Sequence, residues 1–205
     1  MSLKETLARS VLAESYVRKR RLTRWIANGL PRPPVSEFKQ LSVLYYALAY
    51  GLEVLVETGT YLGDMVWAQR PYFKRIYSIE LSAELYAKAQ DRFARDANVT
   101  LLHGDSSDRL GEVVATLDGP ALFWLDGHYS GGITAKGEKI CPIYAELEHV
   151  FSSEQPHVVL IDDARLFDGT DDYPTVAELT EFVRLNSHYS ARVAGDMIIL
   201  LPSTQ

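Results

Sequence analysis

The sequence predicts an α/β fold in which helices cover both faces of a doubly wound, Rossmann-like sheet, preceded by an N-terminal helical annex. From residue 53 onward, short apolar runs alternate with segments of helical character. The runs lack polar alternation, which is typical of parallel strands that are buried on both faces. A chain of 205 residues, 47% of them hydrophobic, suits one sizeable domain of this kind rather than two.

The N-terminal segment has the pattern of two helices. Between residues 3 and 28, apolar residues recur at helical spacing, namely Leu3, Leu7, Val11, Leu12, Tyr16 and Val17. The motif PRPP at 31–34 ends this stripe, because proline lacks the amide donor and restricts the residue before it. A second helix is expected from Ser36, with one face formed by Phe38, Leu41, Tyr45, Leu48 and Leu52. We therefore divide the chain into a helical extension, 1–34, and a main domain, 35–205.

The main domain alternates between strands and helices. The predicted strands lie in the apolar runs 53–57, 75–80, 99–105, 121–126 and 157–163. Helices are expected within 82–97, 106–117, 141–151 and 175–186, with Ser82 and Ser106 as N-caps. Parallel strands joined by such helices form right-handed crossovers. The segments 190–196 and 197–202 follow each other so closely that they predict a closing antiparallel hairpin.

The formal charge of −6 is unevenly distributed. Residues 1–34 carry eight Lys or Arg against two Glu, and they include the run RKRR at 18–21. The acidity of the whole chain disfavours nucleic acid as the main partner. A phosphate-binding role for the basic run is the alternative. We prefer to interpret it as a solvated helix face that docks on the acidic body or on a second subunit, which would give a homo-oligomer through the N-terminal helices.

Several classes of protein are disfavoured by the sequence. No apolar run approaches the ~20 residues needed to cross a bilayer, so we expect no membrane partner. Charged residues occupy the N-terminal stretch where a signal peptide would have its apolar core. Cys141 is the only cysteine, which excludes an internal disulfide and a zinc site with several cysteines. These features predict a cytoplasmic protein.

Acidic residues stand at the end of every predicted parallel strand. They are Glu57, Glu80, Asp105, Asp126, and Asp162 with Asp163. In an open α/β sheet, ligands bind beyond the carboxyl ends of the strands. Clustered like charges repel one another and cost stability unless a bound group offsets them. The pattern therefore predicts a ligand site at this edge of the sheet.

The first turn of the main domain, residues 57–64, distinguishes between two kinds of nucleotide ligand. Its sequence ETGTYLGD contains Gly59 and Gly63 but lacks the third glycine of the G-x-G-x-x-G pyrophosphate-binding motif. Gly59 permits a tight turn and close backbone approach, and Asp64 is placed to open the next helix. Glu80 follows at the ~20-residue distance at which an acid accepts hydrogen bonds from ribose hydroxyls. The turn favours an adenosyl ligand without a pyrophosphate.

The strings VETGTYLGD, YSIEL, HGDSSD, FWLDGHYS and VVLIDDA resemble, in order, the motifs of class I S-adenosylmethionine-dependent methyltransferases. Within that superfamily they are most similar to the small-molecule O-methyltransferases, including the catechol and macrocin types. The resemblance implies a seven-stranded sheet with an antiparallel last strand. It implies that Glu57, Gly59 and Tyr61 line the methionine part of the cofactor, that Glu80 binds the ribose, and that Asp105 and Ser106 lie beside the adenine. Thr60, Gly63, Leu81 and Asp126 complete the expected cofactor site.

Asp126, Asp162 and Asp163 form a candidate metal site. Metal-dependent members of the family that the chain resembles have one acid after the fourth strand and an Asp-Asp or Asp-Asn pair after the fifth, and LDGH and IDDA match that arrangement. Carboxylates on adjacent strand ends supply hard oxygen ligands for a divalent cation, Mg²⁺ above all. Such a cation lowers the pKa of a substrate hydroxyl and orients it. The alternative is that Asp162 only caps the sheet edge while Asp163 faces solvent.

The expected general base differs from that of the catechol-type enzymes. Those enzymes have a lysine three residues after the acid of the fourth strand, whereas this chain has Tyr129. His128 titrates near neutrality and is our candidate catalytic base, with Asp126 beside it. The long, glycine-rich connection 127–142 is interpreted either as a substrate-closing lid, in which Lys136 and Lys139 contact an anionic acceptor, or as a solvated loop.

The sequence thus predicts an S-adenosylmethionine-dependent O-methyltransferase that acts on a small hydroxylated molecule with the help of a divalent metal. Two alternatives stay open. The fold is also compatible with a nicotinamide-dependent oxidoreductase. A cofactor-binding or interaction protein without catalytic activity is the other possibility, because a fold alone does not determine function.

Overall fold

A computed structural model describes residues 3–127 and 141–203, with residues 3–14 described by their backbone alone. The chain divides into two compact units, Met1–Ser42 and Val43–Gln205. Within the described residues, no helix combines the length and the apolar character needed to cross a membrane.

The first unit is helical, as the sequence predicts. It contains α1 (Leu3–Ala27) and the first half of α2 (Ser36–Tyr50). The ring of Trp25 packs against that of Phe38 with 4.9 Å between centroids, and the Trp25 indole nitrogen donates a hydrogen bond to the Pro31 carbonyl over 2.7 Å. Arg21 forms an ion pair with the Glu37 carboxylate at 3.2 Å. These contacts join the end of α1 to the start of α2.

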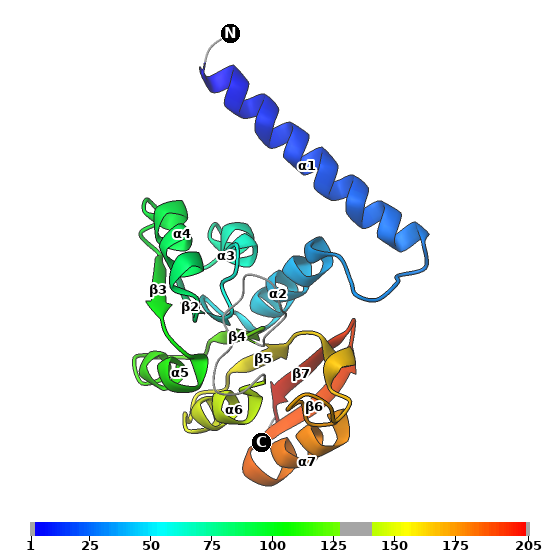
Figure 1. The fold of residues 1–205 in the computed structure, drawn as a ribbon, viewed down its shortest axis with the longest axis vertical. Coiled ribbons are helices and arrows are strands. Elements are labelled where there is room, and N and C mark those ends of the chain that lie inside the picture. Colours follow the sequence, from blue (N-terminus) through cyan, green and yellow to red (C-terminus); the bar gives the residue numbers. More distant parts are fainter. Residues whose placement is uncertain (1–2, 128–140, 204–205) are drawn as a thin grey trace. The chain divides into compact units, whose positions relative to one another are not determined.

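The second unit is built on a sheet of seven strands in the order β3-β2-β1-β4-β5-β7-β6 (Figure 1). The strands are β1 (Val54–Thr58), β2 (Arg75–Glu80), β3 (Val99–His103), β4 (Leu122–Leu125), β5 (Val158–Ile161), β6 (Tyr189–Ala194) and β7 (Met197–Pro202). The first five are parallel, while β7 runs antiparallel to both β5 and β6. The doubly wound sheet, its antiparallel last strand and the closing hairpin are therefore confirmed.

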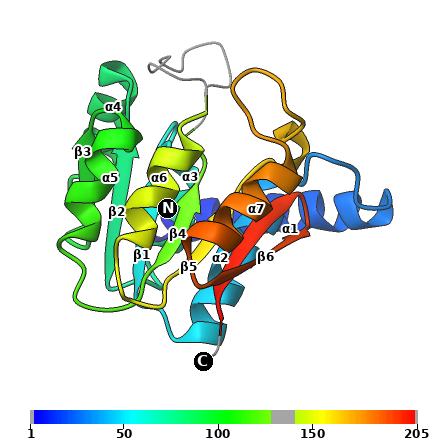
Figure 2. The same ribbon diagram turned by 90° about the horizontal axis from the view of Figure 1, so that it is seen from below.

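Helices cover both faces of this sheet. They are α3 (Asp64–Gln69), α4 (Ala83–Phe93), α5 (Ser106–Val114), α6 (Ile143–Phe151) and α7 (Val176–Asn186), with a short 3₁₀ turn η1 (Ala164–Leu166) after β5. Figure 1 shows α3 and α4 on one face and α5, α6 and α7 on the other. Figure 2 shows these last three helices in front of the strands.

One of the two predicted N-caps is confirmed and the other is wrong. The Ser82 side chain caps α4 by accepting a hydrogen bond from the Leu85 amide. The cap of α5 is Asp105, whose carboxylate accepts from the amide of Ser107, so Ser106 is the first residue of the helix rather than its cap. An aspartate is as good an N-cap as a serine, and the residue in extended conformation takes the position.

The core lies where the central strands meet α5, α6 and α7. All residues of β4 and β5 are buried, and the side chains of Phe123, Leu147 and Leu179 are completely inaccessible. Such strands are apolar on both faces because helices cover both sides. This packing fixes the register of the strands and therefore the relative positions of the residues that follow them.

Candidate functional site

The register places the carboxyl ends of four neighbouring strands level with one another. Thr58 at the end of β1 pairs with Ile79 in β2 and with Leu125 in β4, and Leu125 pairs with Ile161 in β5. The pairing continues one step further, since the Asp126 amide donates to the Thr58 carbonyl (3.1 Å) and the Asp162 amide donates to the Leu125 carbonyl (3.0 Å). The acids after these strands therefore lie along one edge, as predicted.

The turn after β1 requires glycine at position 59. Gly59 has φ +82°, and a Cβ there would lie 2.4 Å from the Asp126 carbonyl oxygen. Its amide donates to the Ile79 carbonyl over 2.9 Å, which holds the turn against β2. Gly63 also has a positive φ, and a Cβ at that position would lie 2.7 Å from the ring of Phe93. The turn after β1 thus passes directly against the first residues after β4, at the point where the strand order reverses.

A buried chain of hydrogen bonds surrounds Glu57. This side chain is 2% exposed and accepts a hydrogen bond from the Ser78 hydroxyl. The Thr60 hydroxyl lies 2.6 Å from the Ser78 oxygen and acts as donor, because the Ser78 proton points to Glu57. Burial raises the pKa of Glu57 to about 8; the negative charges of Asp126 and Glu80 add to this effect, and the Ser78 hydrogen bond opposes it. At this pKa, the carboxyl is mostly protonated at pH 7.

The Glu80 carboxylate is held by two backbone amides. One oxygen accepts from the Tyr61 amide over 2.7 Å, and the other accepts from the Ser82 amide over 2.8 Å. Tyr61 reaches this position with φ 49°, and its side chain is about half exposed. Leu81 stands between Glu80, at the end of β2, and Ser82, the cap of α4. Each oxygen keeps further lone pairs, which are suitable acceptors for the hydroxyls of a ribose.

Asp105 has a structural function in addition to its predicted place beside an adenine. Its carboxylate accepts from both the amide (2.9 Å) and the hydroxyl (2.8 Å) of Ser107. Ser106 is largely buried next to it. The Asp105 carboxylate therefore has a fixed orientation at the end of β3.

Three carboxylates converge after β4 and β5. One oxygen of each of Asp126, Asp162 and Asp163 lies within 4.8 Å of the others. Asp162 is fully buried, and its carboxylate accepts a hydrogen bond from the Asp163 amide over 2.8 Å. The donor set consists of hard oxygen atoms, which fits Mg²⁺ or Ca²⁺. The structure thus brings together the three residues that the sequence assigns to a metal site, and the assignment itself stays a prediction.

Three nearby residues were missed by reasoning from the sequence. Ser78 could have been noticed, because it is a hydroxyl inside the otherwise apolar run of β2. Asp196 lies in the β6–β7 turn, is 1% exposed and forms an ion pair with Arg165. Tyr173 is a buried side chain that packs edge-on against Phe167 at 5.3 Å; burial raises the pKa of its hydroxyl, and the nearby charges of Asp163 and Asp126 add to this effect. Nothing in the local sequence marks the last two.

Several residues of the predicted catalytic loop lie outside the part of the chain that the structure describes. The candidate base His128 lies outside the described residues, together with Tyr129, Lys136 and Lys139. Cys141 is described and is buried. Burial raises the pKa of its thiol to about 12, which leaves it without nucleophilic character at neutral pH.

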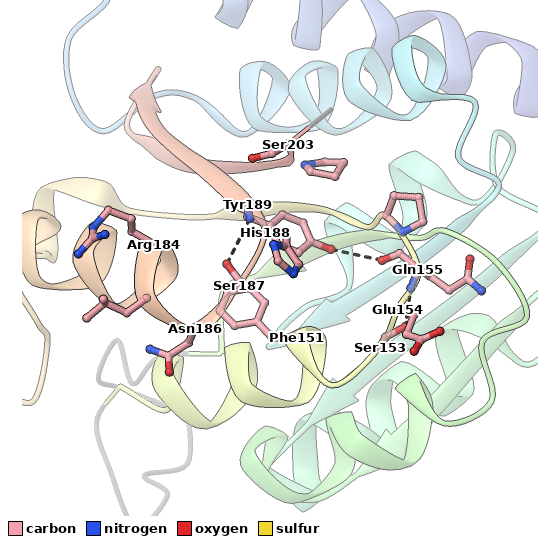
Figure 3. Close-up of a pocket in the computed structure, with 13 residues that line it drawn as sticks. Phe151, Ser153, Glu154, Gln155, Arg184, Asn186, Ser187, His188, Tyr189 and Ser203 are labelled. Carbon is pink, nitrogen blue, oxygen red and sulfur yellow. Dashed lines mark hydrogen bonds between the residues drawn. The ribbon is translucent and has the colours of Figure 1, made fainter. Parts of the chain in front are cut away.

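A separate pocket of about 820 Å³ lies at the other end of the strands, next to the segment that enters β5. Figure 3 shows its wall, in which Phe151 and Tyr189 come from α6 and β6, and Gln155 comes from the segment that enters β5. The Tyr189 hydroxyl donates a hydrogen bond to the Gln155 carbonyl over 3.4 Å. None of the predicted site residues lines this pocket, so it is not part of the candidate site.

Comparison with known proteins identifies the fold. No protein-family model matches the sequence, and no curated protein matches it either. Solved structures do match. The O-methyltransferase TomG from Streptomyces achromogenes, in complex with S-adenosylmethionine, is 18% identical with a TM-score of 0.59 over 91% of this chain and 89% of that one. An O-methyltransferase from Bacillus cereus in complex with S-adenosylhomocysteine is 17% identical, with a TM-score of 0.60 over 90% of each chain. The chain has the class I methyltransferase fold. The 23S rRNA methyltransferase ErmE shares this fold less fully, with 11% identity and a TM-score of 0.51 over 80% of this chain and 68% of that one.

Proposed function

We propose that the protein is an S-adenosylmethionine-dependent O-methyltransferase that acts on a small hydroxylated molecule with the assistance of a divalent cation. The observation that carries this proposal is the position of the three carboxylates of Asp126, Asp162 and Asp163. One oxygen of each lies within 4.8 Å of the others, and the backbone of Asp126 passes directly against the turn at Gly59. A cation and a methyl donor bound at these two places would be neighbours.

Several features support S-adenosylmethionine over a dinucleotide. The strand order 3-2-1-4-5-7-6 with an antiparallel β7 differs from the 3-2-1-4-5-6 order of the dinucleotide-binding fold. The turn 57–64 lacks the third glycine of the pyrophosphate motif. TomG and the Bacillus cereus enzyme, which have the same fold, were solved with S-adenosylmethionine and S-adenosylhomocysteine. We assign the methionine end to Glu57, Gly59, Thr60, Tyr61 and Gly63, the ribose to Glu80 and Leu81, and the adenine to Asp105 and Ser106.

The buried Glu57 suits the positive charge of a bound methionine group. An ammonium or sulfonium nearby would favour the ionised carboxylate, and the hydrogen bond from Ser78 already stabilises that form. Before a cofactor binds, the raised pKa of Glu57 keeps a proton on the same carboxyl at neutral pH. Cofactor binding would therefore release a proton from Glu57.

The cation would be held by Asp126, Asp162 and Asp163. When bound, it would lower the pKa of the acceptor hydroxyl and orient it toward the donor methyl group. His128 or Asp126 would take the hydroxyl proton, as the acceptor oxygen forms its bond to the methyl carbon and the carbon–sulfur bond of the donor breaks. The protein contributes mainly proximity and alignment to such an in-line displacement.

A small molecule is the preferred acceptor. The chain is acidic overall, with a formal charge of −6. Its fold is more similar to TomG than to the rRNA methyltransferase ErmE, by TM-scores of 0.59 and 0.51. We also propose that the basic N-terminal helices contact a second copy of the chain rather than nucleic acid.

Cofactor binding is tested first by isothermal titration with S-adenosylhomocysteine and, separately, with NAD⁺. We expect only the former to bind, and we expect Glu80→Ala to abolish its binding. Glu84→Ala is a matched control, because this exposed glutamate on α4 pairs only with Lys88 in the described contacts and should leave binding unchanged. Binding of NAD⁺ alone would favour the oxidoreductase instead.

Catalysis is tested with S-adenosylmethionine, Mg²⁺ and a library of hydroxylated metabolites, with methylated products detected by mass spectrometry. We expect a product that disappears with EDTA and with Asp162→Asn. Turnover that is unaffected by EDTA would refute the metal function but not the methyl transfer. Binding of S-adenosylhomocysteine without any product would favour the non-catalytic alternative.

A further inference from the structure

A network of hydrogen bonds connects the candidate metal site to the hairpin turn between β6 and β7. The guanidinium of Arg165 donates from one nitrogen to the Asp163 carboxylate, at 2.7 Å, and to the Asp196 carboxylate. Arg165 lies in the short turn η1 directly after β5, whereas Asp196 is 31 residues away in sequence. The arginine side chain is 31% exposed, so the pair is shielded from solvent mainly on the side of Asp196.

Asp196 is held in this position by hydrogen bonds of its backbone as well as of its side chain. It is 1% exposed and adopts φ 65° in the turn. Its carbonyl accepts from the Ala164 amide over 2.8 Å, and its carboxylate accepts from the Arg165 amide over 3.1 Å in addition to the guanidinium. A buried carboxylate with two such contacts, on a residue whose carbonyl makes a third, is a fixed anchor rather than a solvated surface group.

Asp163, by contrast, has an unusual backbone conformation. It has φ 55° and ψ 45°, in the left-handed region that residues other than glycine seldom adopt. Its amide donates to the Asp162 carboxylate, and its own carboxylate accepts from Arg165. With this backbone conformation, the carboxylates of the consecutive residues Asp162 and Asp163 both lie in one cluster with that of Asp126.

We propose that Arg165, anchored by Asp196, is a positioning residue that holds Asp163 as the third carboxylate ligand of the cation. The inference rests on the cation site of the proposed function. Carboxylates that bind metals are themselves hydrogen-bonded by outer partners, and loss of such a partner weakens metal binding by roughly 10- to 100-fold. Arg165 contacts Oδ1 of Asp163, and a carboxylate has a second oxygen and further lone pairs with which to bind a cation.

The opposite effect is the competing explanation. A guanidinium next to Asp163 repels a cation, so its removal would tighten binding if repulsion were dominant. The anchor at Asp196 favours positioning, because the buried Asp196 carboxylate shares the arginine's charge and thereby reduces its repulsion toward the cluster. The two explanations predict changes of opposite sign.

The test is Mn²⁺ binding, measured by electron paramagnetic resonance on the full chain without methyl donor or acceptor. We expect Arg165→Gln to weaken Mn²⁺ binding by roughly 10- to 100-fold. Asp196→Asn keeps the shape of the anchor but removes its charge, and it should weaken binding in the same direction. Arg184→Gln is the control, since Arg184 on α7 is exposed and pairs with Glu181.

If Arg165 only supported the fold, its replacement would also weaken the binding of S-adenosylhomocysteine. The affinity for S-adenosylhomocysteine, measured on the same variants, should stay within about threefold of the parent if Arg165 acts through Asp163 alone. Equal loss of both affinities would overturn the inference, as would unchanged or tighter Mn²⁺ binding in Arg165→Gln. If Asp196→Asn fails to fold, Arg165→Gln decides the question, because its side chain is partly exposed.

The outcomes also separate this inference from the proposed function. A parent protein that binds S-adenosylhomocysteine but not Mn²⁺ would refute the positioning function and the cation site, while the methyl-donor site would stand. A parent that binds neither would refute the proposed function as a whole.

Discussion

Replacement of Glu57 by glutamine removes an ionisable group from the interior of the sheet and keeps nearly the same shape. The amide oxygen of the substituted side chain can still accept the hydrogen bond that Ser78 donates to Glu57. In the folded protein, burial raises the pKa of Glu57 to about 8, from an ordinary value of 4.5. Between these two pH values, the folded state keeps a proton that the unfolded state releases.

The sign and size of the effect follow from this difference. The stability of the parent protein falls as the pH rises from 4.5 to 8, because folding must then restore a proton to Glu57. Each pH unit in that window corresponds to ~1.4 kcal/mol. The parent therefore loses up to about 3 kcal/mol by pH 7 and about 5 kcal/mol above pH 8 from this group. The Glu57→Gln variant has no such proton and should be more stable than the parent by those amounts.

The assay is urea unfolding at pH 5, 7 and 9, in EDTA and without cofactor, for the parent, Glu57→Gln and the control Glu84→Gln. The advantage of Glu57→Gln should be small at pH 5 and should increase with pH, while the exposed Glu84 on α4 should show no comparable trend. A difference that does not depend on pH would refute the reasoning. The same variant should bind S-adenosylmethionine more weakly by roughly 10- to 100-fold, because it loses a charged hydrogen-bond acceptor.

Three further predictions concern other parts of the second unit. Gly59→Ala should abolish S-adenosylhomocysteine binding in calorimetry, since its Cβ would lie 2.4 Å from the Asp126 carbonyl oxygen. Gly119→Ala should bind normally, because a Cβ at position 119 would have no atom within 4 Å. Equal binding by the two variants would contradict the close approach at Gly59. His157 is fully buried, and burial lowers its pKa from 6.5 to about 4. As the pH falls through this window, the unfolded state takes up a proton before the folded state does. The free energy of unfolding should therefore fall by up to about 3 kcal/mol. Unfolding curves of His157→Gln should lack this loss of stability, whereas those of His188→Gln, a change at an exposed histidine, should retain it. Identical pH profiles for the two variants would rule out His157 as its cause. Addition of Mg²⁺ to the parent should raise its melting temperature, as expected for a ligand that binds only the folded state, and Asp162→Asn should remove that shift.

The strand ends could be predicted because two local regularities were sufficient. Apolar runs without polar alternation identify strands buried on both faces, and parallel strands place their carboxyl ends at one edge. The convergence of Asp126, Asp162 and Asp163 follows from these rules once the register aligns Leu125 with Ile161. No distant contact had to be known.

Features that depend on distant contacts could not be predicted. The pair of Arg165 and Asp196 joins residues 31 positions apart, and in sequence Asp196 is only part of a Gly-Asp turn. Helix α2 is apolar around much of its circumference, so periodicity could not select the buried side. Tyr45 and Leu48 from the predicted stripe are exposed by 64% and 74%, whereas Val43, Tyr46 and Ala47 are buried.

The acids along the sheet edge are stabilised in different ways, and this distinguishes the two halves of the candidate site. The charge of Glu80 is offset by two backbone amides, and that of Asp105 by the first turn of α5. Glu57 is protonated and therefore neutral at pH values below its raised pKa of about 8. Glu57, Glu80 and Asp105 therefore carry little unbalanced charge at neutral pH before a ligand binds, contrary to the expectation that all these acids repel until something binds.

The half assigned to the cation depends on side-chain charge. Asp163 is balanced by Arg165, whose position depends in turn on the β6–β7 turn. Changes in that turn should therefore alter cation binding while leaving the donor half intact, since Glu57 and Glu80 make their hydrogen bonds within β1, β2 and the loops that follow these strands. The last hairpin of the sheet contributes no predicted ligand, but through Asp196 it would belong to the proposed cation site.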